Sequence, residues 1–185
     1  MRILGIESSS LVASVAVVTD GVVTAEYTVN FKKTHSQTLL PMLDEIVRMV
    51  ELDLETVDAI AVSGGPGSFT GLRIGSATGK GLGLALKKPL IHIPTVDGMA
   101  YGMYGYGGLV CPIMDARRNQ VYTGIYDNRE GFTAVREQCA MDIDELVDEL
   151  NNMETRVVFL GDGVPVYSER IAERMTVPFS FAPAH

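Results

Sequence analysis

Short apolar runs separated by polar turns open the chain. Residues 2–8 and 14–21 are rich in β-branched side chains and predict two strands joined by a short polar turn. An Asp-Gly turn at Asp20 leads to a third predicted strand over 21–29. The chain is therefore expected to begin with a three-stranded meander.

The pattern then alternates between helical and strand periods. Apolar residues at helical spacing predict a helix over 36–51, with Ser36 as its candidate N-cap. The elements expected next are a buried strand over 57–64, a helix over 69–86, a strand over 89–94 and a helix that starts at Thr95. This alternation is typical of an α/β protein.

Five glycines fall within residues 98–108, where we place the boundary between two lobes, 1–104 and 105–185. After them the order of elements repeats. The second lobe is expected to contain strands over 109–115, 119–127 and 132–140, a helix capped by Asp142, a strand over 156–161 and a helix over 164–175. Each lobe is therefore predicted to be a mixed sheet with flanking helices.

Composition favours an ordered protein with little affinity for nucleic acid. Of 185 residues, 46% are hydrophobic, and 15 basic against 23 acidic residues give a net charge of -8. Residues 101–185 carry 7 arginines, no lysine and 13 acidic residues, a poor surface for phosphate backbones. Two cysteines match neither a metal site nor a disulfide framework. With no apolar run long enough for a signal peptide or membrane helix, we expect a cytosolic protein with no membrane partner.

The segment SGGPGSFTGLRIG, residues 63–75, lies at a predicted junction of strand and helix, where phosphates are often bound. It is not a Walker motif, because the lysine is missing and the later Lys80 is followed by Gly81. It is not a dinucleotide fingerprint, because Thr70 replaces the third glycine. Anion binding by backbone amides alone stays open as the alternative.

The glycines have a second interpretation. Gly71, Gly75, Gly79 and Gly83 are spaced by four and lie on one face of the predicted helix. Each costs about 1 kcal/mol relative to alanine in a helix interior, so close packing must compensate. The stripe allows another backbone to approach closely, either that of the chain's own sheet or that of a partner. Both interpretations, packing on the chain's own sheet and packing on a partner, stay open.

Hydrolytic and metal chemistry are weakly supported. His35 and Ser36 are adjacent, which is unusual for a nucleophile and its base, and no G-x-S-x-G is present. His92 lies in an apolar predicted strand and is interpreted as a core histidine. No H-x-x-x-H pair occurs.

Three motifs in order, HSQTLLP (35–41), GPGSFTGLRIG (65–75) and DARRNQVYTGIY (115–126), are similar to the TsaB family of bacterial tRNA-modification proteins, also called YeaZ. The resemblance covers essentially the whole chain, although family members usually continue further. It implies a two-lobed actin-like ATPase fold, ribonuclease H-like in each lobe and related to sugar kinases and heat-shock chaperones. The motif residues are His35, Ser36, Gly65, Pro66, Gly67, Ser68, Phe69, Thr70, Gly71, Arg73, Asp115, Arg117 and Tyr122.

The resemblance also implies a function. Family members are non-catalytic partners of TsaD, which works with the ATPase TsaE to build threonylcarbamoyl onto the adenosine beside the anticodon. We therefore expect tRNA to be reached only through the complex, no intrinsic cofactor, and ATP only in the assembled complex. The alternative is a weak ATPase or kinase-like enzyme of the same fold. An older, glycoprotease-like label finds no triad or metal pair in this sequence.

Three functional parts of the TsaD enzymes are missing from this sequence. The H-x-x-x-H metal pair of TsaD aligns with Thr95 and Met99, which are poor ligands for a divalent ion. Its glycine-rich phosphate turn aligns with Asp115, Arg117 and Arg118. The first turn, within 7–14, lacks the glycine of kinases and chaperones. An inactive subunit is expected.

The helices over 36–51 and 69–86 are the expected partner surface. Leu40, Met42 and Met49 widen the apolar stripe of the first helix beyond the ~100° arc that a surface helix needs, although Met42 and Met49 could instead fill core gaps. The family resemblance implies pairing through these helices, with TsaD or as a homodimer when alone. The expected contacts are Leu39, Leu40, Leu43, Val47, Gly71, Gly75, Lys80 and Leu82.

Overall fold

The computed structural model describes residues 1–31 and 34–183, and its contacts divide the chain into two compact units, Met1–Thr95 and Val96–His185. The division falls earlier than the expected boundary at 104/105. The reason is the helix α3 (Thr95–Tyr101), whose Val96 and Ala100 are fully buried in a core of the second unit.

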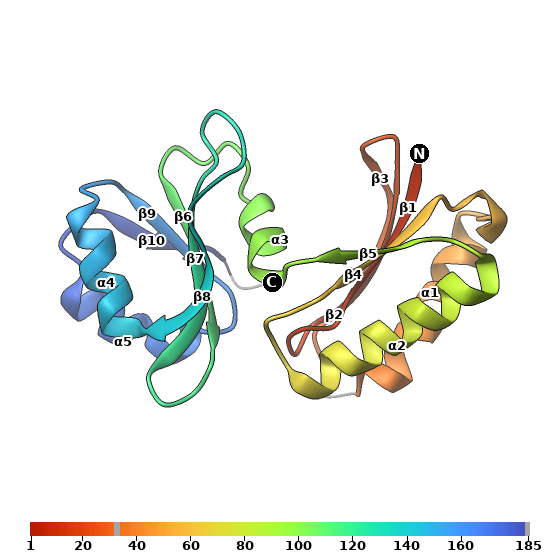
Figure 1. The fold of residues 1–185 in the computed structure, drawn as a ribbon, viewed down its shortest axis with the longest axis horizontal. Helices are drawn as coiled ribbons and strands as arrows, with labels where there is room; N and C mark the ends of the chain where they lie inside the picture. Colours follow the sequence, from red (N-terminus) through yellow and green to blue (C-terminus); the bar gives the residue numbers. More distant parts are fainter. Residues whose placement is uncertain (32–33, 184–185) are drawn as a thin grey trace. The chain divides into compact units, whose positions relative to one another are not determined.

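The first unit is a mixed five-stranded sheet with two helices lying side by side on one of its faces (Figure 1). Its elements are β1 (Arg2–Glu7), β2 (Ala13–Thr19), β3 (Val22–Val29), α1 (His35–Met49), a 3-10 turn (Leu54–Thr56), β4 (Ala59–Ser63), α2 (Phe69–Leu86) and β5 (Leu90–Ile93). The strand order is β3-β2-β1-β4-β5. The meander pairs antiparallel, and β4 and β5 run parallel to β1 and β4 respectively.

Alternating residues of the first sheet make its core with α1. Leu4 and Val17 of the strands are fully buried, as is Ile60 of β4. From α1, Leu39 and Ile46 pack onto them at helical spacing. The strand period of two and the helix period of 3.6 therefore meet in one apolar layer.

The second unit repeats this topology. Its elements are β6 (Leu109–Asp115), β7 (Gln120–Asp127), β8 (Thr133–Asp142), α4 (Ile143–Asn152), β9 (Val157–Leu160), α5 (Val164–Arg174) and β10 (Phe179–Phe181). The order β10-β9-β6-β7-β8 is the first sheet's order read from the other edge. The predicted α/β class of two mixed sheets with flanking helices is confirmed. In the second unit β10, three residues long, has no counterpart in the sequence prediction.

Both faces of the second sheet are covered (Figure 1). On one face Leu146 of α4 and Ile171 of α5 are fully buried against Phe159 of β9. On the other face the core of α3 includes Tyr126, whose hydroxyl donates to Asp97 Oδ1 at 2.6 Å. None of the helices within residues 1–31 and 34–183 combines the length and apolarity needed to span a bilayer.

The predicted N-cap residue is confirmed for α4 and is wrong for α1. Asp142 precedes α4 and its side chain accepts a hydrogen bond from Asp144 N at 2.8 Å, as expected of an N-cap. The expected cap Ser36 is wrong, because α1 begins at His35 and Thr34 is its N-cap residue, without a side-chain cap bond.

The glycine stripe of α2 faces the chain's own sheet. A Cβ atom on Gly71 would lie 2.0 Å from Ser8 O, and one on Gly75 would lie 2.2 Å from Ser8 Oγ. A Cβ on Gly79 would lie 2.5 Å from the Val62 side chain. All the stripe's glycines are buried. Gly71 and Gly75 are thus wrong as partner contacts, because the turn after β1 occupies the space in front of them.

Replacing Gly75 with alanine tests this packing. Alanine favours the helix, yet its methyl would meet the Ser8 hydroxyl, so Gly75→Ala should lower the free energy of unfolding by about 1–3 kcal/mol. Gly81 of the same helix is exposed with nothing within 4 Å of a Cβ, so Gly81→Ala should raise it by about 0.5–1 kcal/mol. Urea denaturation measures both. Equal changes in the two variants would contradict the packing.

Candidate functional site

The glycine loop before α2 is held against the turn that follows β1. Ser68 N donates to Ser9 O at 2.6 Å, and a Cβ on Gly67 would lie 2.4 Å from that same oxygen. Ser68 is also the N-cap of α2, because its hydroxyl accepts from Gly71 N at 3.2 Å. The close backbone approach explains why glycine stands at 67.

Three further side chains complete this junction. Ser8 Oγ donates to Gly71 O at 2.9 Å, so the first turn of α2 is bound from the β1 side. The His35 ring lies 2.8 Å, Nε2 to oxygen, from Ser10 O and joins the start of α1 to the same turn. Thr95 Oγ1 accepts from Gly65 N at 3.1 Å, and Thr95 N donates to Gly65 O at 2.9 Å. Motif residues from distant parts of the first unit therefore meet in one hydrogen-bonded cluster.

Three amides of this loop and the first turn of α2 already have acceptors within the chain. A phosphate at a helix start is bound by free backbone N–H groups of the loop and first turn. Here the N–H groups of Gly65, Ser68 and Gly71 donate to Thr95, Ser9 and the Ser68 hydroxyl. The loop thus serves packing and hydrogen bonding within the chain.

Other motif side chains lie on the surface. Phe69 is 69% exposed, and the Arg73 guanidinium stacks over its ring at 3.7 Å from the centroid. Thr70 and Ser36 are also exposed, whereas Pro66 is half-buried. The motif therefore divides into a buried cluster and an exposed patch at the start of α2.

The third motif, which begins at Asp115, contains the hairpin turn between β6 and β7. Asp115 Oδ1 accepts from Arg117 N at 2.9 Å and from the Tyr167 hydroxyl at 3.0 Å. Burial, with this hydrogen bond to Asp115, raises the pKa of Tyr167. Arg117, Arg118 and Asn119 all have positive φ, at 65°, 52° and 62°. Such conformations are costly for non-glycine residues and persist where surrounding contacts determine them.

The guanidiniums of that turn project without partners. Among the described residues neither Arg117 nor Arg118 makes a side-chain hydrogen bond or ion pair, and both are exposed. Tyr122, also of the motif, is half-buried against the core of α3. A carboxylate and two exposed arginines thus stand at this turn.

Thr95 and Met99, the positions that the family resemblance compares with a metal pair, both make structural contacts. Thr95 binds the glycine loop, and the Met99 methyl group would lie 2.6 Å from a Cβ on Gly161. Within residues 1–31 and 34–183, no three His, Cys, Asp or Glu side chains group as a metal site.

His92 is not the core histidine expected from its apolar strand. It is exposed, and its Nε2 lies 3.1 Å from Gly64 O. A Cβ on Gly64 would lie 1.7 Å from Nε2, so the ring explains the glycine at 64. The sequence pattern missed this because β5 is an edge strand, where apolar residues need not be buried.

The expected partner contacts separate into two classes. Leu39 and Leu43 belong to the core, and Val47 and Leu82 are half-buried against it. Leu40 is 55% exposed, and Lys80 is exposed on α2. Of the two methionines offered as core fillers, Met42 is buried and Met49 is 75% exposed. Of the expected contacts, Leu40 and Lys80 are exposed, as is Met49, which widens the apolar stripe of α1; Phe69 and Leu84, which were not expected, are exposed as well.

The chain matches known proteins along most of its length. The family model described as TsaD, tRNA N6-adenosine threonylcarbamoyltransferase, matches residues 22–182. The tRNA threonylcarbamoyladenosine biosynthesis protein TsaB of Bacillus subtilis (strain 168) is 33% identical over 175 residues, which is 94% of this chain and 76% of that protein. TsaB of Escherichia coli (strain K12) is 37% identical over 132 residues, 70% of this chain and 57% of that protein.

Solved structures agree. An uncharacterized Pseudomonas aeruginosa protein with similarity to peptidase YEAZ has a TM-score of 0.83 at 26% identity, over 99% of this chain and 83% of its own. A second structure, YeaZ from Pseudomonas aeruginosa, has a TM-score of 0.79 at 26% identity, over 98% and 84%. The ethanolamine utilization protein EutJ of Carboxydothermus hydrogenoformans shares the fold alone, with a TM-score of 0.51 at 11% identity over 98% of this chain and 84% of its own.

The N-cap of α2 at Ser68 can be tested with Thr70, which belongs to the same motif, as the control. Ser68→Ala removes the acceptor of Gly71 N and should lower the free energy of unfolding by about 1 kcal/mol. Thr70 is exposed on the same turn, and Thr70→Ala should change it by less than about 0.5 kcal/mol. A chemical denaturation series on both variants checks this. A loss at Thr70 as large as at Ser68 would show that the Ser68 bond is not what stabilises the loop.

Proposed function

Because the chain belongs to the TsaB (YeaZ) family, we propose that it takes part in threonylcarbamoyladenosine biosynthesis on tRNA as a non-catalytic partner of a TsaD-type transferase and a TsaE-type ATPase. The relatives from Bacillus subtilis and Escherichia coli carry that biosynthetic role in their names. The family match to the transferase itself supports a shared ancestry with the enzyme.

One observation carries the non-catalytic role: the chain fills its own phosphate-binding positions. In the first unit the loop amides bond to Ser9, Ser68 and Thr95. In the second unit the turn between β6 and β7, which corresponds in topology to the turn between β1 and β2, carries Asp115 and two arginines with positive φ. A weak ATPase or kinase-like enzyme, the alternative function, would need these positions open.

The partner surface is proposed to be the outer face of α1 and α2. These helices lie side by side on the first sheet (Figure 1). Their buried faces make the core, and Leu40, Met49 and Leu84 remain at 55%, 75% and 83% exposure. Large exposed apolar side chains on neighbouring helices support an interaction surface there. We propose that this surface binds the transferase and pairs two copies when the transferase is absent.

Binding of tRNA is proposed to be indirect. With a net charge of -8, the chain offers few phosphate contacts. In the second unit four arginines are already ion-paired, with Asp127, Glu149, Asp144 and Asp148. The transferase is therefore expected to hold the tRNA.

A reconstituted reaction tests the function. Purified chain, TsaD and TsaE with tRNA, ATP and a threonylcarbamoyl donor should form the modified nucleoside, and leaving the chain out should abolish product, as measured by mass spectrometry of digested tRNA. The chain alone should give none. Product formed by the chain without TsaD would contradict the non-catalytic role.

Single substitutions test the proposed partner surface on α1 and α2. Leu40→Glu puts a charge on the outer face of α1 and should weaken binding to TsaD at least tenfold while the fold is unchanged, measured by calorimetry and circular dichroism. Val22→Glu, on β3 and 67% exposed, is the matched control and should bind normally. Equal losses in both variants, or no loss in Leu40→Glu, would place the interface elsewhere.

A further inference from the structure

Along one side of strand β5, the backbone groups have no partner strand among the described residues. It is the last strand of the first sheet, and among the described residues it pairs only with β4. Pro89 O and Ile93 O accept from Ile60 N and Gly64 N on the β4 side, at 3.0 and 2.8 Å. Because backbone groups alternate along a strand, those of Leu90 and His92 point away from β4. They are free to bind another extended chain.

The edge lacks the usual protection. Natural edge strands carry charges, bulges or covering segments that prevent pairing with another chain. β5 consists of Leu90, Ile91, His92 and Ile93, with no charged residue or bulge, and its three aliphatic side chains are 37%, 37% and 38% exposed. Pro89 and Pro94 limit the strand to these four residues.

A groove runs between this edge and α2. It has a volume of about 590 Å³ and is lined by apolar side chains that include Phe69, Leu72, Ala77 and Leu90. Leu90 and His92 line it, so they face α2, and the alternation of side chains turns Ile91 and Ile93 to the opposite face. A strand added beside β5 would present its own side chains alternately to the groove and to the isoleucines.

The rim of the groove is positively charged. Arg73 and Lys80 line it, and among the described residues neither makes an ion pair. The segment 59–96 contains four Lys or Arg residues and no Asp or Glu, although the whole chain has a net charge of -8. Two copies paired edge to edge would bring these cations together, so like-charge repulsion disfavours self-pairing. A negatively charged peptide would be attracted.

We propose that β5 and the groove bind an extended acidic segment of a partner protein, which adds to the first sheet as a sixth strand. Its main chain bonds to Leu90 and His92. Glutamate stems cover the groove while their carboxylates meet Arg73 and Lys80, and the alternate apolar side chains pack on Ile91 and Ile93. This inference goes beyond the proposed function and does not rest on it.

Two synthetic peptides test the proposal on the full isotope-labelled chain. Acetyl-(Val-Glu)4-amide should bind at least tenfold more tightly than acetyl-(Val-Lys)4-amide, and should slow hydrogen exchange at the Leu90 and His92 amides at least tenfold. The amides of Ile91 and Ile93, which face β4, are internal controls and should change little. Equal binding of both peptides, no saturable binding at millimolar concentration, or binding that leaves Leu90 and His92 unprotected would overturn the proposal.

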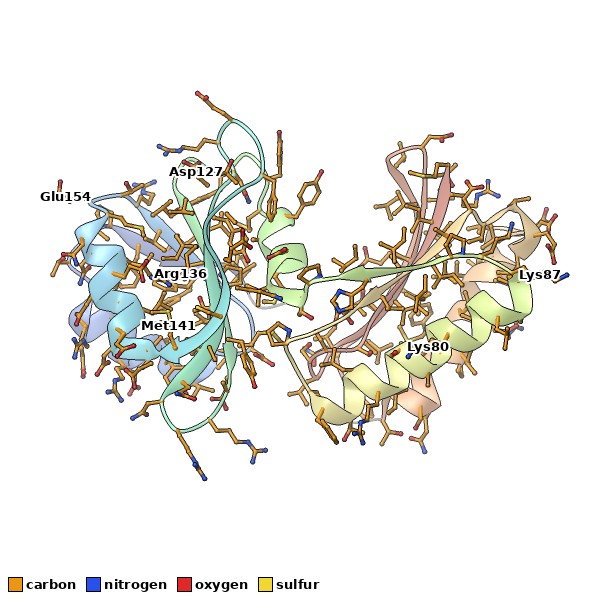
Figure 2. All side chains as sticks on the ribbon, in the orientation of Figure 1. Lys80, Lys87, Asp127, Arg136, Met141 and Glu154 are labelled. Carbon is orange, nitrogen blue, oxygen red and sulfur yellow. The ribbon has the colours of Figure 1, made fainter. Side chains whose placement is uncertain are left out.

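Substitutions test the contribution of the positively charged rim separately from that of the β5 edge. Lys80→Glu should remove the preference for the acidic peptide, whereas Lys87→Glu should not, because Lys87 lies at the C-terminal end of α2 away from the groove lining (Figure 2). His92→Pro lacks the outward N–H and should lose binding at least tenfold, whereas His92→Ala keeps that N–H and should bind. Equal behaviour of the two His92 variants would overturn strand addition. Self-association of the chain abolished by His92→Pro would assign the edge to a second copy and would also overturn it.

Discussion

The close approach between α2 and the turn after β1 is the contact on which the first unit depends. No side chain larger than glycine fits at the positions that face Ser8, because a Cβ on Gly71 or Gly75 would lie about 2 Å from its atoms. This approach brings the loop backbone within hydrogen-bonding distance of Ser9, and it lets Ser8 bind the first turn of the helix. Helix, loop and sheet are therefore one packed element, and the four glycines are stabilised by it despite their low helix propensity.

The contact between α2 and the turn after β1 also affects which ligands the glycine loop can bind. The amides of Gly65 and Ser68 donate to Thr95 and Ser9 of the same chain, which leaves fewer loop N–H groups for an anion. In the second unit, Asp115 accepts hydrogen bonds from Arg117 N and from the Tyr167 hydroxyl, and these bonds hold the turn between β6 and β7. What stays free is surface: the outer face of α1 and α2, and the edge of β5. Exposed apolar side chains on these helices are typical of a surface that binds a partner.

The sequence predicted most of the fold because local patterns were strong. The range 69–86 for α2 and 109–115 for β6 agree with the structure, and the repeat of element order is complete in the two sheets. The site was harder to predict. Glycine spacing shows that something approaches the helix closely, but only the fold shows that it is the Ser8 turn. Likewise, apolar periodicity cannot tell Leu39, which is buried, from Leu40, which is 55% exposed. His92 was misread because burial at an edge strand depends on tertiary neighbours.

Equilibrium titration of the isolated chain with ATP, followed by backbone amide shifts, tests the central claim that the glycine loop serves internal packing. The account predicts no saturable binding up to millimolar ATP and no shift at the amides of Gly65, Ser68 and Gly71, because these amides are already bonded within the chain. Micromolar affinity with shifts centred on these amides would contradict it, since the loop would then act as a phosphate site.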